Sequence, residues 1–244
     1  MTTRVAVVTG GGSGIGRATC TRLTADGFTL AVLDVDGEAA KVAAGPDGLG
    51  CAADVADRDA VDVAFAQVVE AFGRIDVLVN NAGVSGTFDA GVCHETTVEE
   101  WDRVLAINTR GPFLCARAAL PVMLAQGDGH VITVASVAGQ VAFPGRCAYT
   151  ASKGAALMFA KSLAADYAAA GIRSNAVCPG FVRTPMTQWR LDVPELREQV
   201  EARIPTGRVA EPDDIADAIA VLASGRLGYM TGAALVVDGG WTVL

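Results

Sequence analysis

A chain of 244 residues that is 51% hydrophobic and 19% charged has the composition of a folded protein, which excludes the intrinsically disordered class. Its formal net charge of −8 argues against a nucleic-acid partner, because no run of lysines or arginines offers a basic surface to a phosphate backbone. The six cysteines stand singly without a C-x-x-C pair, which argues against a disulfide framework or a zinc site and favours reduced thiols.

The sequence predicts no attachment to a membrane. Its most apolar helical stretch, residues 154–172, is interrupted by Lys161 and Asp166, which is typical of a buried helix and not of a membrane span. The first residues run directly into a strand-like segment, so no secretory signal peptide is expected. We therefore expect a cytoplasmic protein.

Short β-branched runs alternate with longer helical patterns along the chain. Strands are predicted at Val5–Thr9, Thr29–Asp34, Leu49–Ala53, Ile75–Asn80, Val131–Ser136, Ile172–Cys178 and Ala234–Val237. Helices are predicted at residues 14–26, 37–44, 57–72, 98–126, 147–170 and 212–223. Thr96 and Thr97 each precede a glutamate by three residues, which is the spacing of a capping box, and Pro212 suits a first helical turn.

Strands that alternate with helices need right-handed crossovers, which build a parallel sheet covered on both faces. The predicted fold class is therefore α/β: a single-domain, doubly wound parallel sheet of about seven strands, as in the Rossmann arrangement. No internal repeat or linker divides the chain, so residues 1–244 are expected to form one domain. Residues 184–206 hold three prolines and a short amphipathic helix near 195–203, and they predict a lid-like insertion.

A glycine-rich loop lies between the first predicted strand and the first predicted helix. Gly10, Gly14 and Gly16 form the pattern G-x-x-x-G-x-G, and glycine is needed where backbone approaches a pyrophosphate closely. The N–H groups at the start of the following helix point at such a ligand. The loop, with Ser13 and Ile15, therefore predicts a dinucleotide-binding site.

Asp34 ends the second predicted strand, where a carboxylate can accept both hydroxyls of an adenosine ribose. A 2′-phosphate there would meet like charge, and two unit charges ~4 Å apart at an effective dielectric constant of ~20 repel by about 4 kcal/mol. Arg17 is the one nearby basic residue that could offset this repulsion. We therefore expect NAD as the cofactor in preference to NADP.

Tyr149 and Lys153 stand four residues apart at the start of a predicted helix, so both side chains project from one face. A phenol with a pKa near ~10 is a poor base at neutral pH, and a neighbouring ammonium group lowers that pKa by stabilising the phenolate. Ser136 ends the preceding strand, where its hydroxyl can hydrogen-bond a substrate oxygen at the carboxyl edge of the sheet. The three residues together predict proton transfer to and from an alcohol or ketone.

Several motifs, in this order along the chain, resemble those of the short-chain dehydrogenase/reductase family. They are Thr9-Gly10-x-x-x-Gly14-x-Gly16, Asn80-Asn81-Ala82-Gly83, Ser136, Tyr149-x-x-x-Lys153, Pro179-Gly180 and Asp238-Gly239-Gly240. The resemblance implies an NAD-dependent oxidoreductase that moves a hydride between nicotinamide and a small secondary alcohol or ketone. It also implies a homotetramer built through the helices 98–126 and 147–170.

The resemblance assigns roles to the site residues. Tyr149 would be the general acid/base, and Lys153 would also hold the nicotinamide ribose. Ser136 would orient the substrate, and Asn108 would support a water-linked proton relay. The alternative for Asn108 is a purely structural role, in which it fills a bend in the helix. The expected cofactor-binding residues are Gly10, Ser13, Gly14, Ile15, Gly16, Asp34, Asp54, Val55, Asn81, Ala82, Gly83, Tyr149, Lys153, Pro179, Gly180, Val182 and Thr184.

Loops over the nicotinamide are expected to bind the substrate. The candidates are Ser85, Gly86, Ser136, Gln140, Val141, Phe143, Cys147, Tyr149, Phe181, Met186 and Trp189. Most of these side chains are apolar, which favours a hydrophobic or mildly polar alcohol over a phosphorylated sugar. Arg183 and Arg190 leave an anionic substrate open.

Three other functions have weaker support. A serine hydrolase would need a G-x-S-x-G elbow, which the sequence lacks. A metal-dependent dehydrogenase would need clustered ligands, whereas His94 and His130 are isolated and expected at the surface, so no metal is expected. A catalytically inactive nucleotide-binding protein would be free to lose Tyr149 or Lys153, and both are present.

The main alternative is a 3-oxoacyl-(acyl-carrier-protein) reductase that uses NADPH. Family members of that kind resemble one another in placing basic residues before the fifth and the sixth strands, where they can dock an acidic carrier. Those places here are residues 127–129 and 168–170, which hold no basic residue. A free small-molecule substrate is therefore favoured.

Overall fold

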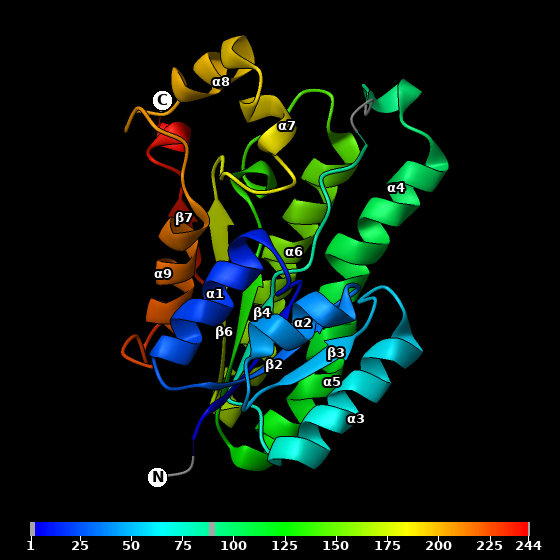
Figure 1. Ribbon diagram of the computed structural model, residues 1–244, viewed down its shortest axis with the longest axis vertical. Helices are drawn as coiled ribbons and strands as arrows, with labels where there is room; N and C mark the ends of the chain where they lie inside the picture. The colour runs from blue at the N-terminus through cyan, green and yellow to red at the C-terminus, as the bar shows by residue number, and fades with distance from the viewer. Residues whose placement is uncertain (1–2, 88–90, 244) are drawn as a thin grey trace.

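A seven-stranded parallel sheet forms the centre of the computed structural model, which describes residues 3–87 and 91–243 (Figure 1). Its strands are β1 (Val5–Thr9), β2 (Thr29–Asp34), β3 (Leu49–Ala52), β4 (Val77–Asn80), β5 (Gly129–Val134), β6 (Ile172–Pro179) and β7 (Ala234–Val237). They lie in the order β3-β2-β1-β4-β5-β6-β7, and every neighbouring pair is parallel. The predicted doubly wound α/β fold is confirmed.

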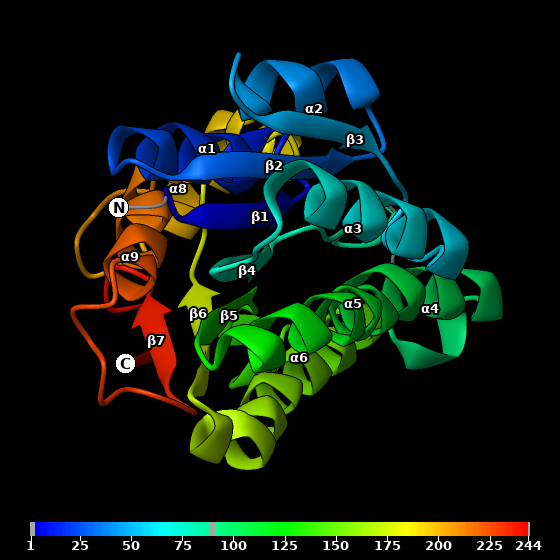
Figure 2. The same cartoon turned by 90° about the horizontal axis from the view of Figure 1, so that it is seen from below.

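Helices cover both faces of this sheet (Figure 2). One face is covered by α1 (Gly14–Ala25), α2 (Gly37–Ala44) and α9 (Pro212–Ala223). The other is covered by α3 (Arg58–Phe72), α5 (Gly111–Gln126) and α6 (Cys147–Tyr167). The remaining helices are α4 (Val98–Leu105), α7 (Gln188–Leu191) and α8 (Pro194–Glu201). Because both faces are covered, β1 is a continuous run of buried residues without polar alternation.

The order of the strands places a crevice at one edge of the sheet. From β1 the chain moves outward through β2 to β3, and it then returns to the other side of β1 to form β4. The connections that leave the carboxyl ends of β1 and β4 therefore run to opposite sides, and ligands of doubly wound proteins bind at this switch point. The glycine loop and the Asn80–Gly83 motif follow these two strands directly.

The helix predicted over residues 98–126 is interrupted. Ala106–Arg110 form a π-helical segment between α4 and α5, and Asn108 lies within it with 1% of its surface exposed. A π turn holds one more residue than an α turn and is frequent at functional sites. The sequence did not reveal this segment, because residue types that form a π turn also form an ordinary helix.

The predicted capping box at the start of α4 is half formed. The Thr97 hydroxyl accepts a hydrogen bond from the Glu100 backbone at 3.1 Å, as expected. The Glu100 carboxylate does not return to the cap, because it accepts hydrogen bonds from the Thr87 backbone and the Arg103 guanidinium. The helix start predicted at Pro212 is confirmed, because α9 begins with this residue.

His130 is buried in the core, so its predicted surface position is wrong. Only 1% of its surface is exposed, Nδ1 lies 3.1 Å from the Leu222 carbonyl, and Nε2 lies 2.9 Å from Asn175 Nδ2. Asn175 also donates to the Met230 carbonyl at 2.9 Å and accepts from the Ala233 backbone at 3.0 Å. This network ties β5 and β6 to α9 and to the loop before β7, and His94 is the exposed one of the two histidines.

The buried His130 makes the stability of the protein dependent on pH. Burial and the nearby Arg173 lower the pKa of His130 from 6.5 to about 3, although a hydrogen bond with Leu222 opposes this shift. The unfolded chain therefore binds a proton at a higher pH than the folded chain does, and stability is lost as the pH falls below about 6.5. Because one pKa unit corresponds to about 1.4 kcal/mol, we expect a loss of about 2 kcal/mol between pH 6.5 and pH 5 from this residue.

Urea unfolding of the wild type, His130→Gln and the exposed control His94→Gln at both pH values measures the effect. Wild type and His94→Gln should both lose about 2 kcal/mol more than His130→Gln over this interval. Equal losses in all three proteins would show that His130 does not carry the pH dependence.

Candidate active site

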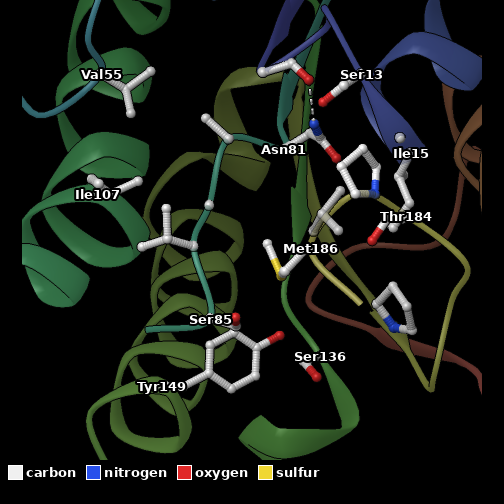
Figure 3. Close-up of a pocket in the computed structure, with 18 of the residues that line it drawn as sticks. Ser13, Ile15, Val55, Asn81, Ser85, Ile107, Ser136, Tyr149, Thr184 and Met186 are labelled. Carbon is white, nitrogen blue, oxygen red and sulfur yellow. Dashed lines mark hydrogen bonds between the residues drawn. The ribbon is translucent and has the colours of Figure 1, made fainter. Parts of the chain in front are cut away.

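A cavity of about 570 Å³ opens at the carboxyl edge of the sheet. Its walls come from the glycine loop, the end of β2, the loop after β4, the end of β5, α6 and the segment after β6. Figure 3 shows Ser13 and Asn81 at one end and Tyr149 with Ser136 at the other, with Met186 between the two ends. The cavity is therefore long enough to join the glycine loop to the predicted catalytic residues.

The glycine loop has the geometry that an anionic ligand requires. Gly14 has a φ of +49°, and a Cβ at Gly16 would lie 2.0 Å from the Gly10 carbonyl oxygen, so neither position accepts another residue without strain. The first turn of α1 holds no acidic residue, and Ser13 makes no side-chain cap. The first N–H groups of α1 have no acceptor within the helix and remain available to a phosphate.

Asp34 is held in the cavity wall by two hydrogen bonds. It lines the cavity at the carboxyl end of β2, and its Oδ2 and Oδ1 accept hydrogen bonds from the backbones of Gly12 and Asp36 at 2.8 and 3.1 Å. These two bonds fix the carboxylate while each oxygen keeps a second lone pair for a ligand hydroxyl. Arg17, the one nearby basic residue that could have offset this charge, is exposed on α1 and is not among the cavity-lining residues.

Asn81 holds the glycine loop against the end of β4. Its Nδ2 donates to the carbonyl oxygens of Thr9 and Gly10 at 3.0 Å each, and its backbone N–H donates to the Thr9 hydroxyl at 3.0 Å. Both amide protons of Asn81 are therefore used within the protein. The side chain supports the cofactor loop, and only its oxygen is open to a ligand.

Tyr149 and Ser136 come together at the far end of the cavity. Tyr149 lies in the first turn of α6, Ser136 follows β5, and Figure 3 shows their hydroxyl groups close to one another. Burial raises the pKa of Tyr149, and a hydrogen bond with Ser136 opposes that rise. The predicted lowering of this pKa by Lys153 is not found, so the phenol is protonated at neutral pH.

Lys153 lies behind Tyr149 on the same face of α6, as the four-residue spacing predicts. Its Nζ is 5.8 Å from the centre of the Tyr149 ring and donates to the Val134 carbonyl at 2.9 Å. The residue is 6% exposed, and burial lowers its pKa to about 8, although the electrostatic influence of the Cys178 side chain opposes this shift. The side chain is mostly an ammonium ion at pH 7 and can lose its proton just above it.

Asn108 is fixed by three hydrogen bonds. Its Oδ1 accepts from the Val84 backbone at 2.8 Å, and its Nδ2 donates to the Val84 carbonyl at 2.8 Å and to the Ser152 hydroxyl at 3.0 Å. Ser152, which is fully buried, donates in turn to the Tyr149 carbonyl at 2.7 Å. Sequence reasoning missed Ser152, although its place directly before Lys153 was a signal. Asn108 thus connects the loop after β4 to the helix that carries Tyr149.

Nearly all predicted cofactor residues lie in the cavity wall. Those that line it are Gly10, Ser13, Gly14, Ile15, Asp34, Asp54, Val55, Asn81, Ala82, Gly83, Tyr149, Lys153, Pro179, Gly180, Val182 and Thr184. Gly16 is buried behind the loop and is not part of the wall. The prediction missed several lining residues, namely Leu33, Val35, Ala53, Val84, Arg103, Ile107, Val134, Ala135, Pro185 and Thr187.

The predicted substrate residues separate into two groups. Ser85, Gly86, Ser136, Tyr149 and Met186 line the cavity. Gln140, Val141, Phe143, Cys147, Phe181 and Trp189 are not among its lining residues. The second group lies in the loop before α6, at the first residue of α6, after Gly180 and in α7.

Two arginines lie close in sequence or by hydrogen bond to residues that line the cavity. Arg146 precedes α6, and its Nη1 donates to the carbonyl oxygens of Ser85 and Thr87 at 3.4 and 2.8 Å. Arg190 lies in α7, three residues after the cavity-lining Thr187. Its Nε is buried and has no hydrogen-bond acceptor in the part of the chain that the structure describes. Within the same described residues no metal-binding cluster of ligands and no helix able to cross a membrane is found.

Comparison with known proteins gives matches over almost the whole chain. A family model described as Enoyl-(Acyl carrier protein) reductase matches residues 10–242. The chain is 53% identical to 2-(R)-hydroxypropyl-CoM dehydrogenase of Xanthobacter autotrophicus, with 99% of each chain covered. It is 40% identical to cis-4-hydroxycyclohexanecarboxylate dehydrogenase of Sinomonas cyclohexanicum, over 99% of this chain and 97% of that one.

Two further similarities bear on fold and function. The 3-oxoacyl-(acyl-carrier-protein) reductase of Staphylococcus aureus is 39% identical, with 98% of each chain covered. Among solved structures, levodione reductase has a TM-score of 0.91 and 36% identity, again with 98% of each chain covered. The matched proteins are reductases and dehydrogenases, and the fold is theirs from end to end.

Proposed function

Because this chain belongs to the short-chain dehydrogenase/reductase family, whose members use a nicotinamide cofactor, we propose that it interconverts a small secondary alcohol and its ketone with NAD. It is an oxidoreductase that acts on CH–OH groups. The observation that carries the finer proposal is the placement of Tyr149, Ser136 and Lys153 at one end of a cavity whose other end is the glycine loop.

The cavity fits a dinucleotide. The glycine loop and the N-terminus of α1 would hold the pyrophosphate, and Asp34 would accept the hydroxyls of the adenosine ribose. When bound, the nicotinamide supplies the acceptor or donor of the hydride. The carboxylate of Asp34 is fixed in place and would repel the 2′-phosphate of NADP, and Arg17 does not line the cavity to offset that repulsion. Both observations support NAD over NADP.

Tyr149 would transfer the proton at the substrate oxygen. Its raised pKa keeps the phenol protonated, which suits donation to the oxygen of a ketone. In the reverse direction the phenol must first release its proton to solvent, and the resulting phenolate then takes the proton from the alcohol. Ser136, which hydrogen-bonds Tyr149, would orient the same oxygen. Because Tyr149 can act only on an oxygen within hydrogen-bond distance, Ser136 limits which alcohol is productive.

Lys153 would supply positive charge near the phenol and a donor to the ribose beside it. Gly83 lies between Lys153 and Asn108, since a Cβ added there would be 3.4 Å from Lys153 Nζ and 3.2 Å from Asn108 Oδ1. The proton relay that the family resemblance implies for Asn108 stays a prediction. Its three hydrogen bonds support a positioning role alongside it.

The arginines at the substrate end refine the expected substrate. A buried guanidinium N–H without an acceptor loses a hydrogen bond that it made with water, and an anionic group on the substrate would restore it. Arg190 offers such a donor three residues after the lining residue Thr187, and Arg146 donates to the carbonyl of the lining residue Ser85. An alcohol that ends in an anionic group is therefore expected to be used better than a neutral analogue.

A substrate panel tests the proposal with wild-type enzyme and both cofactors. It contains 2-(R)-hydroxypropyl-CoM, its S enantiomer, cis-4-hydroxycyclohexanecarboxylate, neutral secondary alcohols and a 3-oxoacyl thioester. We expect oxidation of an alcohol with NAD, faster for anionic than for neutral members, as followed by absorbance of the reduced cofactor.

Other outcomes would replace the proposal. If the thioester were turned over fastest, with NADPH, the protein would be a 3-oxoacyl-(acyl-carrier-protein) reductase. This is the alternative function because one 39% identical relative is such a reductase. Tight binding of cofactor without turnover of any member would establish a nucleotide-binding protein without this activity.

We also propose a homotetramer in the cytoplasm. The described cysteines are all free thiols, which suits a reducing compartment. Phe113 of α5 and Met158 of α6 are 49% and 61% exposed, and apolar surface on these two long helices is suited to contact with a second copy. Light scattering should give the mass of four chains, and a monomer at micromolar concentration would contradict it.

A further inference from the structure

Residues 238–243 form a turn directly after β7, held by the Asp238 carboxylate. The Asp238 carboxylate accepts hydrogen bonds from the Gly240 backbone at 2.8 Å and from the backbone and hydroxyl of Thr242 at 2.8 and 2.7 Å. Burial alone would raise the pKa of Asp238, but these hydrogen bonds hold it below its usual value. The turn is therefore stable at neutral pH, and it fixes the position of Trp241.

Trp241 contacts three side chains from distant parts of the sequence. Its ring centre lies 5.7 Å from that of Phe143 at a tilt of 41°, and 6.3 Å from that of Phe181, on which it stacks at 16°. The guanidinium of Arg203 lies 5.0 Å from the ring centre of Trp241. One partly buried indole thus joins three segments, two of which, the turn at Phe181 and the segment 184–206, also pack against each other.

Each of these segments borders the catalytic end of the cavity. Phe143 lies in the loop that connects Ser136 to Tyr149, and Phe181 stands between two lining residues, Gly180 and Val182. Arg203 belongs to the segment 184–206, which was predicted as a lid.

The lid segment is itself packed on the chain end. Leu191, Val200, Ile204 and Val209 form a small apolar cluster against which Phe181 and Trp241 pack. The Thr206 backbone donates to the Gly239 carbonyl at 3.1 Å.

We propose that Trp241 is a positioning residue that sets the shape of the substrate end of the cavity by holding the loop 140–146, the turn 180–183 and the segment 184–206 together. It touches none of the reacting groups. Its effect passes through Phe143 to the loop between Ser136 and Tyr149, and through Phe181 to the cavity wall. The adenosine end of the cavity has no contact with it, so cofactor affinity is independent of Trp241.

Trp241→Ala and Trp241→Phe test this role, with Val243→Ala as the control from the same tail, because Val243 is 77% exposed. In hydrogen exchange, Trp241→Ala should accelerate exchange in residues 140–146, 180–183 and 194–206, while wild type and Val243→Ala agree. Trp241→Phe, which keeps an aromatic ring, should restore most of the protection. Should Trp241→Ala fail to fold, Trp241→Leu takes its place in the same measurement.

The kinetic part of the test rests on the proposed function. For Trp241→Ala we expect kcat/KM for the alcohol to fall by about 10- to 100-fold, chiefly through KM, while the KM and dissociation constant of the cofactor stay within about twofold. Unchanged exchange in the three segments would overturn the proposal, and so would an equal loss of cofactor affinity. If the wild type turned over no alcohol, the proposed function would fail, and the exchange result would still decide the role of Trp241.

Discussion

Tyr149→Phe is expected to lose turnover by about three orders of magnitude while the protein stays folded and binds its cofactor. The substitution removes one hydroxyl group and keeps the ring, so packing in the first turn of α6 is preserved. General acid/base catalysis contributes roughly 10²- to 10⁴-fold to enzymatic rates, and this variant would lack the group that performs it. Steady-state turnover, cofactor titration and thermal unfolding measured on one preparation separate these effects.

Tyr167→Phe provides the matched control, because Tyr167 is the last residue of the same helix and lies far from the cavity. It should retain wild-type turnover. Turnover of Tyr149→Phe within about tenfold of wild type would remove Tyr149 from the proposed mechanism. A cofactor affinity lost together with activity would instead show that the ring no longer occupies its place in the cavity wall.

Residues whose role depends only on neighbours in the sequence were predictable. Gly14 and Gly16 stand where any other residue would be strained, and a short glycine pattern in the sequence is enough to indicate such positions. The pairing of Tyr149 and Lys153 follows from the period of a helix, and the structure places both in one cavity wall. Asp34 was found because a strand end fixes where a carboxylate emerges.

Properties that depend on surroundings were not predictable. His130 lies in β5, and the sequence alone placed it at the surface. It can be buried because Leu222 and Asn175, which lie elsewhere in the sequence, hydrogen-bond to its ring. The pKa of Tyr149 is raised where the Tyr–Lys spacing predicted a lowered value, because burial exceeds the influence of its neighbours.

Long-range contacts account for the remaining differences. Phe143 and Phe181 were expected to face a substrate, and both instead contact Trp241, which is remote from them in sequence. The role of the tail follows from the order of β6 and β7 in the sheet, because β7 delivers the chain end to the same edge as the cavity. A pattern with a period of two or 3.6 residues carries no information on such a contact.

Asp34→Asn is expected to remove the preference for NAD over NADP. The amide keeps the shape of the carboxylate and can still accept the hydrogen bond from Gly12, so the glycine loop stays in place. What it removes is the negative charge, whose repulsion of a 2′-phosphate at ~4 Å amounts to about 4 kcal/mol. At about 1.4 kcal/mol per tenfold change, the ratio of kcat/KM for NAD to that for NADP should fall by two to three orders of magnitude.

Most of this change should come from improved use of NADP, because the repulsion acts on the phosphate, whereas the amide still offers one acceptor to the ribose of NAD. Asp36→Asn is the control: Asp36 is an exposed acid two residues further on, and it caps α2 without lining the cavity. Its cofactor ratio should match that of the wild type, and its stability should be close to that of the wild type, because asparagine caps a helix about as well as aspartate. A wild type that prefers NADP, or an Asp34→Asn ratio equal to that of Asp36→Asn, would mean that charge at the end of β2 does not select the cofactor. The search would then move to Ser13 and Val35, which line the cavity beside it.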